Sequence, residues 1–239
     1  MNEAGSSDII LLCEHASNHI PPEYGSLGLS ASDLERHIAF DLGAAALTRR
    51  LSELLDAPAF LGSYSRLLID LNRPLGAPTS IPIRSEDTDI PGNIGITAEE
   101  TRRRTKAIFT PFHSRIGDFL DHRLTERRPS RIVTIHTFTP TFLGHPRPWH
   151  AGVLFDAAGP FGRKTLDRMV EPGLLIGANV PYKTDRTEDY ALPIHGDDRG
   201  IAAIMIEVRN DLLNGVGDTN EWGNRIARAV TSNWWPRLA

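Results

Sequence analysis

The sequence contains one cysteine, Cys13, among 239 residues. A lone thiol excludes an internal disulfide framework, and such composition is typical of a reducing compartment. The first residues, MNEAGSSD, lack the apolar core of a signal peptide. No apolar run approaches the roughly 18 residues that a membrane span needs. We therefore expect a cytoplasmic protein that does not contact a membrane.

An excess of charge of one sign is also missing. Lys and Arg total 26 against 30 Asp and Glu, which leaves a net charge of −4, and no long basic block occurs. Binding to nucleic acid or anionic lipid therefore has no electrostatic support. Hydrophobic residues make up 40% of the chain, enough to build a sizeable core at this length. Because no repeat or linker is visible, we predict a single domain over residues 1–239.

Short apolar runs alternate with longer amphipathic segments along the chain. This alternation predicts an α/β layer architecture with a mixed, mostly parallel central sheet. Serine and threonine residues that precede two of the amphipathic segments are typical helix caps. The predicted strands are 9–13, 66–71, 131–135, 152–155 and 202–208, and the predicted helices are 30–55, 97–127, 162–174 and 220–235.

Polar side chains gather where the predicted strands end. The stretch CEHASNHIPP follows the first apolar run, DLNR ends the second, His136 follows VTI in the third, and Glu207 follows IMI in the last. Open α/β sheets bind ligands at the carboxyl ends of their strands, so these side chains are expected to meet there. Each stretch alone also has a structural explanation. Polar residues often end a strand, His136 is equally consistent with a core histidine, and Asp70 and Arg73 are equally consistent with a structural ion pair.

Together, these residues suit a hydrolytic metal centre. Two imidazoles, from His15 and His136, with one oxygen ligand and one open position are typical of catalytic zinc. A glutamate beside such a metal, here Glu207, can move a proton between water and the leaving amine. The Asn72–Arg73 pair can bind a carboxylate, because guanidinium offers it two parallel hydrogen bonds.

On these motifs the sequence resembles the N-formylglutamate amidohydrolase family and, more distantly, the zinc carboxypeptidases and aspartoacylase, over roughly residues 8–235. The resemblance implies a three-layer α/β/α, zinc-carboxypeptidase-like fold and a zinc-dependent amidohydrolase. Its expected reaction is cleavage of an N-acyl acidic amino acid, such as N-formyl-L-glutamate to formate and L-glutamate. The segments that carry the resemblance are CEHASNHIPP, HIAFDLGAAAL, YSRLLIDLNRP, IPGN, IHTFTP, RPWHAGVL, NVPY and IEVRNDL.

The resemblance also implies roles for individual residues. His15 and His136 match metal ligands, Glu207 matches the general acid/base, and Asn72 and Arg73 match the carboxylate clamp. Two further substrate contacts are predicted at Arg66, just before the DLNR stretch, and at His195, in a loop before the last strand.

The third metal ligand departs from the carboxypeptidase pattern His-x-x-Glu. Here Asn18 follows His15 by three residues, and a neutral amide oxygen is a poorer zinc ligand than a carboxylate. Asp41 is the predicted replacement, because an acidic residue falls near there in the formylglutamate family. Glu14 and His19 remain alternatives, and Asp41 is equally consistent with an ordinary helix residue four positions after His37.

Two other functions are compatible with the same residues. One is a deacylase or peptidase for a different N-acyl amino acid or small peptide, selected by the Pro-rich loops 74–95 and 137–150. The other is a non-catalytic protein that binds a small acidic molecule. The sequence leaves the oligomeric state and the identity of the acyl group open.

Overall fold

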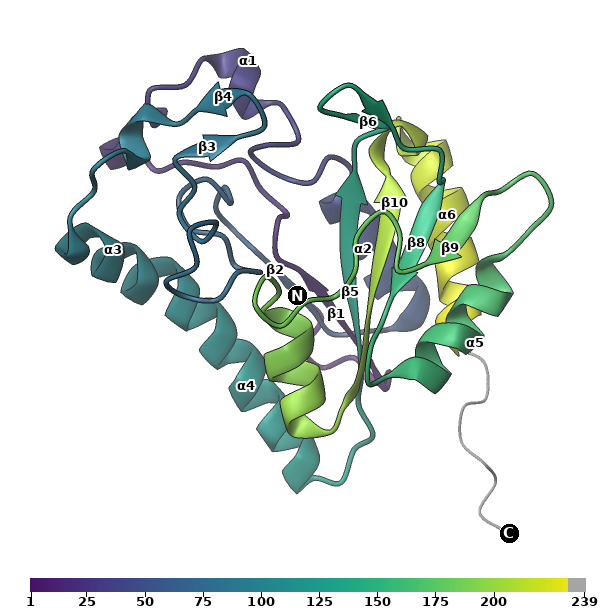
Figure 1. Cartoon of the computed structure of the whole chain (residues 1–239). Helices are drawn as coiled ribbons and strands as arrows, with labels where there is room; N and C mark the ends of the chain where they lie inside the picture. The colour runs from purple at the N-terminus through teal and green to yellow at the C-terminus, as the bar shows by residue number, and fades with distance from the viewer. Residues whose placement is uncertain (232–239) are drawn as a thin grey trace, which may run out of the picture.

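A six-stranded mixed sheet lies at the centre of the computed structural model, which describes residues 1–231 (Figure 1). Its first four strands are parallel, and the last two run antiparallel to them. The predicted α/β class with a mostly parallel sheet is confirmed. In spatial order the strands are β2 (Ala59–Leu61), β1 (Ile9–Cys13), β5 (Arg131–Phe138), β10 (Ala202–Arg209), β8 (Ala151–Leu154) and β9 (Ile176–Ala178).

Helices cover both faces of this sheet and give three layers (Figure 1). Alternate side chains of each strand enter opposite cores, as the period of two in a strand requires. Ile9 and Leu11 pack against α2 (Ala44–Leu55), α5 (Gly159–Met169) and α6 (Val216–Thr231). Ile10 and Leu12 face α4 (Thr110–Thr125) instead.

The helix predicted over 97–127 is nearly continuous, from α3 (Ala98–Arg104) through a π-helical turn (Thr105–Phe109) into α4. Its predicted cap is present, since the Thr97 side chain accepts a hydrogen bond from the Glu100 amide. The helix predicted over 162–174 lies earlier, as α5. The one predicted over 220–235 begins at Val216, and residues 232–235 lie outside the described part of the chain.

The prediction of one helix over 30–55 is wrong in its middle. The segment contains α1 (Ala31–Leu34), with Ser30 as its predicted cap, and then α2. Gly43 lies between them at φ 82°, a left-handed conformation that interrupts a helix at little cost to glycine. The interruption leaves Asp41 outside any helix.

The strand predicted over 66–71 is also wrong, because this segment forms turns. Its apolar side chains are buried, but in a separate core cluster beside the sheet. The backbone carbonyls are satisfied by buried side chains rather than by a neighbouring strand, so apolarity here reports burial and not strand pairing. Asn93 donates to the Leu67 carbonyl, Arg104 to that of Leu68 and His113 to that of Leu71, at 2.8, 3.0 and 2.8 Å.

This separate cluster belongs to a lobe that stands beside the carboxyl ends of β5 and β10 (Figure 1). The lobe includes α1 and a small hairpin of β3 (Arg84–Ser85) and β4 (Thr88–Asp89). A second hairpin, β6 (Thr141–Phe142) with β7 (His145–Pro146), follows β5. Within residues 1–231 no helix has the length and apolarity to cross a bilayer.

Candidate active site

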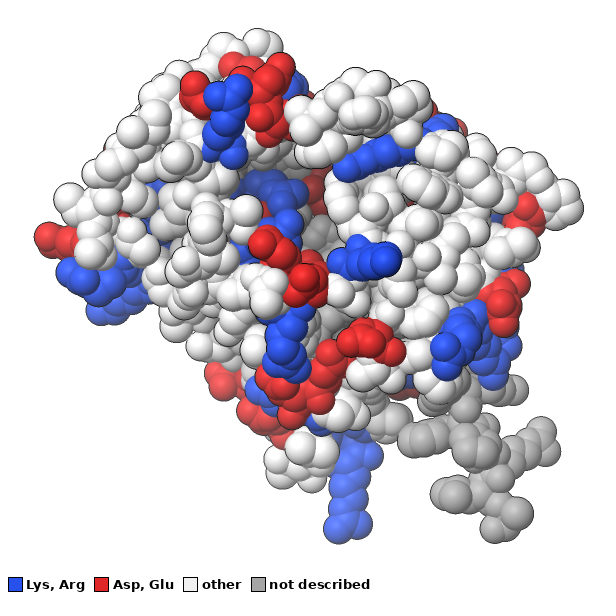
Figure 2. Space-filling view, in the orientation of Figure 1, with Lys and Arg blue, Asp and Glu red and all other residues white. Residues whose placement is uncertain are grey.

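A pocket of about 590 Å³ opens between the lobe and the carboxyl ends of the strands. Figure 2 shows a hollow in the middle of this face, with acidic and basic side chains around it. The pocket is lined by seven of the residues predicted for the site: His15, Asp41, Arg66, Asn72, Arg73, His136 and Glu207.

Two neighbouring parallel strands place His136 and Glu207 side by side. The residues are direct register partners on β5 and β10. On β5, Thr134 and His136 point to the same face of the sheet. On β10, Met205 and Glu207 point to that face too. Closer to the start of the strands, this face forms the apolar core against α4. The polar side chains therefore lie where this apolar face reaches the pocket.

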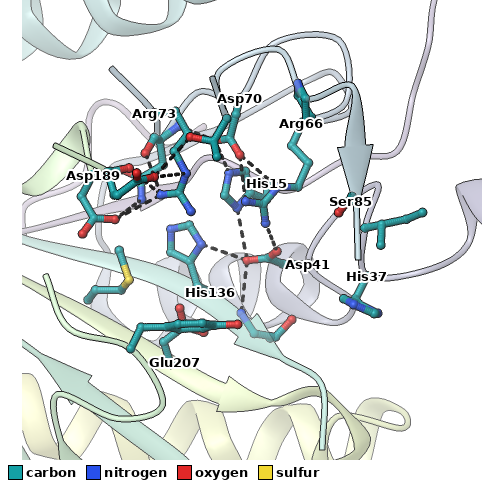
Figure 3. A pocket seen from close by; sticks show the side chains of 18 of the residues that line it. His15, His37, Asp41, Arg66, Asp70, Arg73, Ser85, His136, Asp189 and Glu207 are labelled. Carbon is teal, nitrogen blue, oxygen red and sulfur yellow. Dashed lines mark hydrogen bonds and ion pairs between the residues drawn. The ribbon is translucent and has the colours of Figure 1, made fainter. Parts of the chain in front are cut away.

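His15, Asp41 and His136 form a compact buried group suited to a metal ion. One ligand atom from each lies within 4.8 Å of the others. The Oδ2 atom of Asp41 is 2.9 Å from Nδ1 of His136 and 3.5 Å from Nδ1 of His15 (Figure 3). Asp41 reaches this position from the interruption before α2, and its amide donates to the His15 carbonyl at 3.0 Å.

A second carboxylate holds the outer nitrogen of each ring. Nε2 of His15 is 2.7 Å from Oδ1 of Asp70, and Nε2 of His136 is 2.9 Å from Oε2 of Glu14. A carboxylate accepts hydrogen bonds, so each Nε2 carries a proton. When His136 is charged, its Nδ1 also carries a proton and donates it to Oδ2 of Asp41. In the neutral rings each Nδ1 has a lone pair that points toward Asp41, and metal-binding histidines are oriented in this way.

The carboxylates control the charge of this group. Burial opposes the charged form of His136, yet its hydrogen bonds to Asp41 and Glu14 outweigh burial and hold its pKa well above the usual value. Burial likewise opposes ionisation of Asp41, but the His15 and His136 imidazoles hold its pKa well below the usual value. A group with this surplus of buried negative charge favours a cation in its centre.

Glu207 differs from the other carboxylates of the site. Its side chain is buried, and among the described residues its Oε2 atom has no hydrogen-bond partner. Burial raises the pKa of Glu207 to about 7, with the His136 imidazole opposing the shift. A carboxyl group that titrates near neutrality can accept a proton and return it.

Three predicted substrate contacts, Arg66, Asn72 and Arg73, line the same pocket. Arg66 forms an ion pair with Asp70 at 2.8 Å and a longer one with Asp41 at 3.4 Å. The Asp70–Arg73 ion pair that the sequence left open is not among the ion pairs of the described residues.

Several other candidates lie elsewhere. The Asn18 side chain donates to the Leu34 carbonyl and to Glu35, away from the ligand atoms, and the exposed His19 ring lies 5.7 Å from Tyr64. His195, predicted to touch substrate, is buried and does not line the pocket; its Nε2 is 2.9 Å from Nδ1 of His113. A sequence position before the last strand could not reveal that a π-helical turn (Leu192–Gly196) points this ring into the core.

Three residues near the site were not assigned these positions from the sequence. Asp70 and Glu14 hold the outer nitrogens of the two imidazoles, and Asp189 reaches the Asn72–Arg73 pair from more than a hundred residues away. For Asp70 and Glu14 a signal was present, since both adjoin motif residues. Asp189 lies in a segment without a motif, so only the folded chain reveals it.

Comparison with known proteins places this site in context. Residues 7–214 match the family model described as N-formylglutamate amidohydrolase. A crystal structure of a gene product from Agrobacterium tumefaciens is similar, with a TM-score of 0.93 and 36% identity over 96% of this chain and 91% of that one. A crystal structure of N-formylglutamate amidohydrolase from Ralstonia eutropha shares the fold, with a TM-score of 0.68 and 15% identity over 95% and 92% of the two chains. No match was found among curated proteins.

Proposed function

Because the chain belongs to the N-formylglutamate amidohydrolase family, whose members are hydrolases of amide bonds, we propose that it is a zinc-dependent deformylase of an acidic amino acid. The proposed reaction converts N-formyl-L-glutamate and water into formate and L-glutamate. We propose that the whole chain acts as one catalytic domain.

The metal would be held by Nδ1 of His15, a carboxylate oxygen of Asp41 and Nδ1 of His136. The fit rests on this chain's own atoms: Nδ1 of His15 is buried and, among the described residues, has no hydrogen-bond partner. Three protein ligands of this kind, with one position left for substrate or water, are the set used by catalytic zinc. A bound divalent cation would supply Lewis acidity to the scissile carbonyl and lower the pKa of water.

Glu207 would carry the proton in this reaction. In its ionised form it accepts a proton from the attacking water, which then adds to the formyl carbon. It next donates that proton to the amide nitrogen as the carbon–nitrogen bond breaks, so that the amine leaves as a neutral group. A pKa of about 7 allows both transfers at neutral pH.

The polar side chains on the lobe side of the pocket would orient the substrate. Asn72 and Arg73 offer N–H donors to a carboxylate of the amino acid. Arg66, held by Asp70 and Asp41, lies beside the proposed metal ligands His15 and Asp41 (Figure 3). Its charge would stabilise the oxyanion that forms when water adds to the formyl group.

The observation that carries the proposal is the convergence of the two imidazole Nδ1 atoms on Asp41, with Asp70 and Glu14 behind them. The test is hydrolysis of N-formyl and N-acetyl derivatives of Glu, Asp, Gln and His, followed by release of formate or acetate. We expect the fastest turnover with N-formyl-L-glutamate, its loss after chelation and its recovery with zinc.

Glu207→Gln is the matched variant, because it removes the titrating group and nearly preserves side-chain volume. General acid–base catalysis contributes about 100-fold to 10,000-fold, so kcat should fall by at least about 100-fold while zinc content stays at that of the wild type. Undiminished hydrolysis by this variant would refute the assignment of Glu207.

A further inference from the structure

Asp189 occupies the two donors that we assign to the substrate. Its Oδ1 atom is 3.3 Å from Nδ2 of Asn72 and 3.4 Å from Nη1 of Arg73 (Figure 3). These donors suit an oxygen of any carboxylate, whether it belongs to a ligand or to the chain. The chain itself therefore makes the contact that a substrate carboxylate is expected to make.

The orientation of Asn72 follows from its other contacts. Its Oδ1 atom accepts hydrogen bonds from the backbone amides of Tyr190 and Ala191, at 3.2 and 3.0 Å. An amide oxygen accepts and an amide nitrogen donates, so Nδ2 has to face Asp189. The donor is thus held in place whether or not Asp189 remains on it.

The Asp189 contact is longer than the ion pair between Arg66 and Asp70. Arg73 and Asp189 are 3.4 Å apart, whereas Arg66 and Asp70 are 2.8 Å apart. Hydrogen bonds weaken with length, so an incoming anion replaces the Arg73–Asp189 contact more easily than the Arg66–Asp70 contact.

Asp189 can leave the clamp without unfolding its own turn. Its Oδ2 atom accepts from the Asp185 amide at 2.9 Å, and its backbone amide donates to the Asp185 carbonyl at 2.6 Å. The backbone bond does not involve Asn72 or Arg73. A rotation of the Asp189 side chain would therefore uncover the two donors, while this backbone bond and the Arg73 bond to the Glu188 carbonyl, at 2.6 Å, keep the turn in place.

We propose that Asp189 stands in for the substrate carboxylate in the unliganded enzyme, and that the substrate displaces it from Asn72 and Arg73. The proposal rests on the proposed function in taking these two residues as the carboxylate clamp. Asp189 then determines substrate affinity, because it excludes weak anions and lowers the affinity for the true substrate.

Replacement of Asp189 should strengthen carboxylate binding. Asp189→Asn removes the charge that competes for Arg73, and charge-assisted hydrogen bonds of this kind correspond to roughly a tenfold change in affinity. We expect Kd for glutarate, a dicarboxylate without an amide, to fall by about tenfold in calorimetric titration. KM for N-formyl-L-glutamate should fall by a similar factor with little change in kcat, as expected when ground state and transition state gain equally.

Asp185→Asn is the matched control. Asp185 also lines the pocket, but among residues 1–231 its side chain accepts hydrogen bonds only from Thr187. An equal gain in this control would assign the effect to the general charge of the pocket and overturn the proposal. Asp189→Ser serves as a second variant, and thermal unfolding of each protein shows that it is folded.

Unchanged or weaker glutarate binding in both folded Asp189 variants would also overturn the proposal. Hydrolysis by the wild type separates this failure from that of the proposed function. If the wild type cleaves N-formyl-L-glutamate and the variants gain nothing, only the role of Asp189 is wrong. If the wild type cleaves none of the substrates but the variants bind glutarate more tightly, Asp189 still competes with carboxylate ligands for this site. In that case the proposed hydrolysis reaction is refuted and the role of Asp189 is not.

Discussion

Two buried pairs of histidines lie near the pocket, and they differ in chemistry although they are equally buried. His15 and His136 are each 3% exposed, while His113 and His195 are 7% and 2% exposed. The ring centroids are 4.8 Å apart in the first pair and 5.2 Å apart in the second. Burial alone therefore cannot explain any difference between them.

The difference lies in the partners of the rings. Carboxylates surround the first pair, and their hydrogen bonds keep the pKa of His136 high in spite of burial. The second pair is packed among Phe109, Phe112 and Tyr190, and burial lowers the pKa of His113 to about 4 and that of His195 to about 3. The carboxylates around the first pair favour positive charge there, either a proton on His136 or a metal ion between the rings, and burial keeps the second pair neutral.

A chain of hydrogen bonds explains what the neutral pair does. Nε2 of His113 is 2.8 Å from the Leu71 carbonyl, which can only accept, so this nitrogen carries the proton. Nδ1 of the neutral ring then accepts from Nε2 of His195. The pair thereby holds the turn 70–72. This turn places Asp70 behind His15 and places Asn72 in the carboxylate clamp.

The largest expected effect comes from removing one ring of the charged pair. His136→Ala deletes a proposed metal ligand, so zinc should be lost and hydrolysis should fall by at least about 1,000-fold. The measurement is metal content together with kcat/KM. His113→Ala is the control from the neutral pair, and it should lower stability yet keep zinc at one per chain. Equal zinc loss in both variants would show that zinc binding depends on intact packing around the buried rings and not on ligation by His136.

A smaller effect is expected from the carboxylates behind the rings. Asp70→Asn and Glu14→Gln weaken the orientation of His15 and His136, and such changes typically cost 10-fold to 100-fold in metal affinity. Zinc affinity measured by competition with a chelator tests this. Asn18→Ala is the control, because its side chain bonds Leu34 and Glu35, and its zinc affinity should match the wild type. A loss with Asn18→Ala would return Asn18 to the ligand set.

The neutral pair should make stability depend on pH. The pKa of His113 is lowered from 6.5 to about 4 in the folded chain, so between these values the unfolded chain binds a proton that the folded chain does not. Its contribution to stability is complete above pH 6.5 and is lost as pH falls toward 4, by up to about 3 kcal/mol. Urea unfolding across this range measures it.

His113→Gln keeps a donor for the Leu71 carbonyl but cannot titrate. The free energy of unfolding of this variant should therefore be lower than that of the wild type at pH 7, and it should fall less between pH 6.5 and 4. Parallel curves for the two proteins would contradict a neutral, buried His113.

The sequence predicted the sheet well where strand pairing and burial coincide. Runs such as Ile9–Cys13 and 202–208 are apolar because both of their faces are covered, and the strand ends delivered His136 and Glu207 to the pocket. The run 66–71 contains Leu67, Leu68, Ile69 and Leu71, but these side chains are buried in the lobe, so their apolarity led to a wrong strand. A pattern of apolar residues reports burial, and it cannot report which element provides the cover.

The sequence by itself determined the local and chemical features: alternating strand faces, the caps at Ser30 and Thr97, and the residue types able to bind a metal, a proton and a carboxylate. The tertiary structure decided which of them meet. Only the fold brings Asp41 between two imidazoles, sends His195 into the core and sets Asp189 on the clamp. The reason is that hydrogen bonds between distant residues depend on side-chain positions within about half an ångström, which the whole packed chain sets and no local pattern encodes.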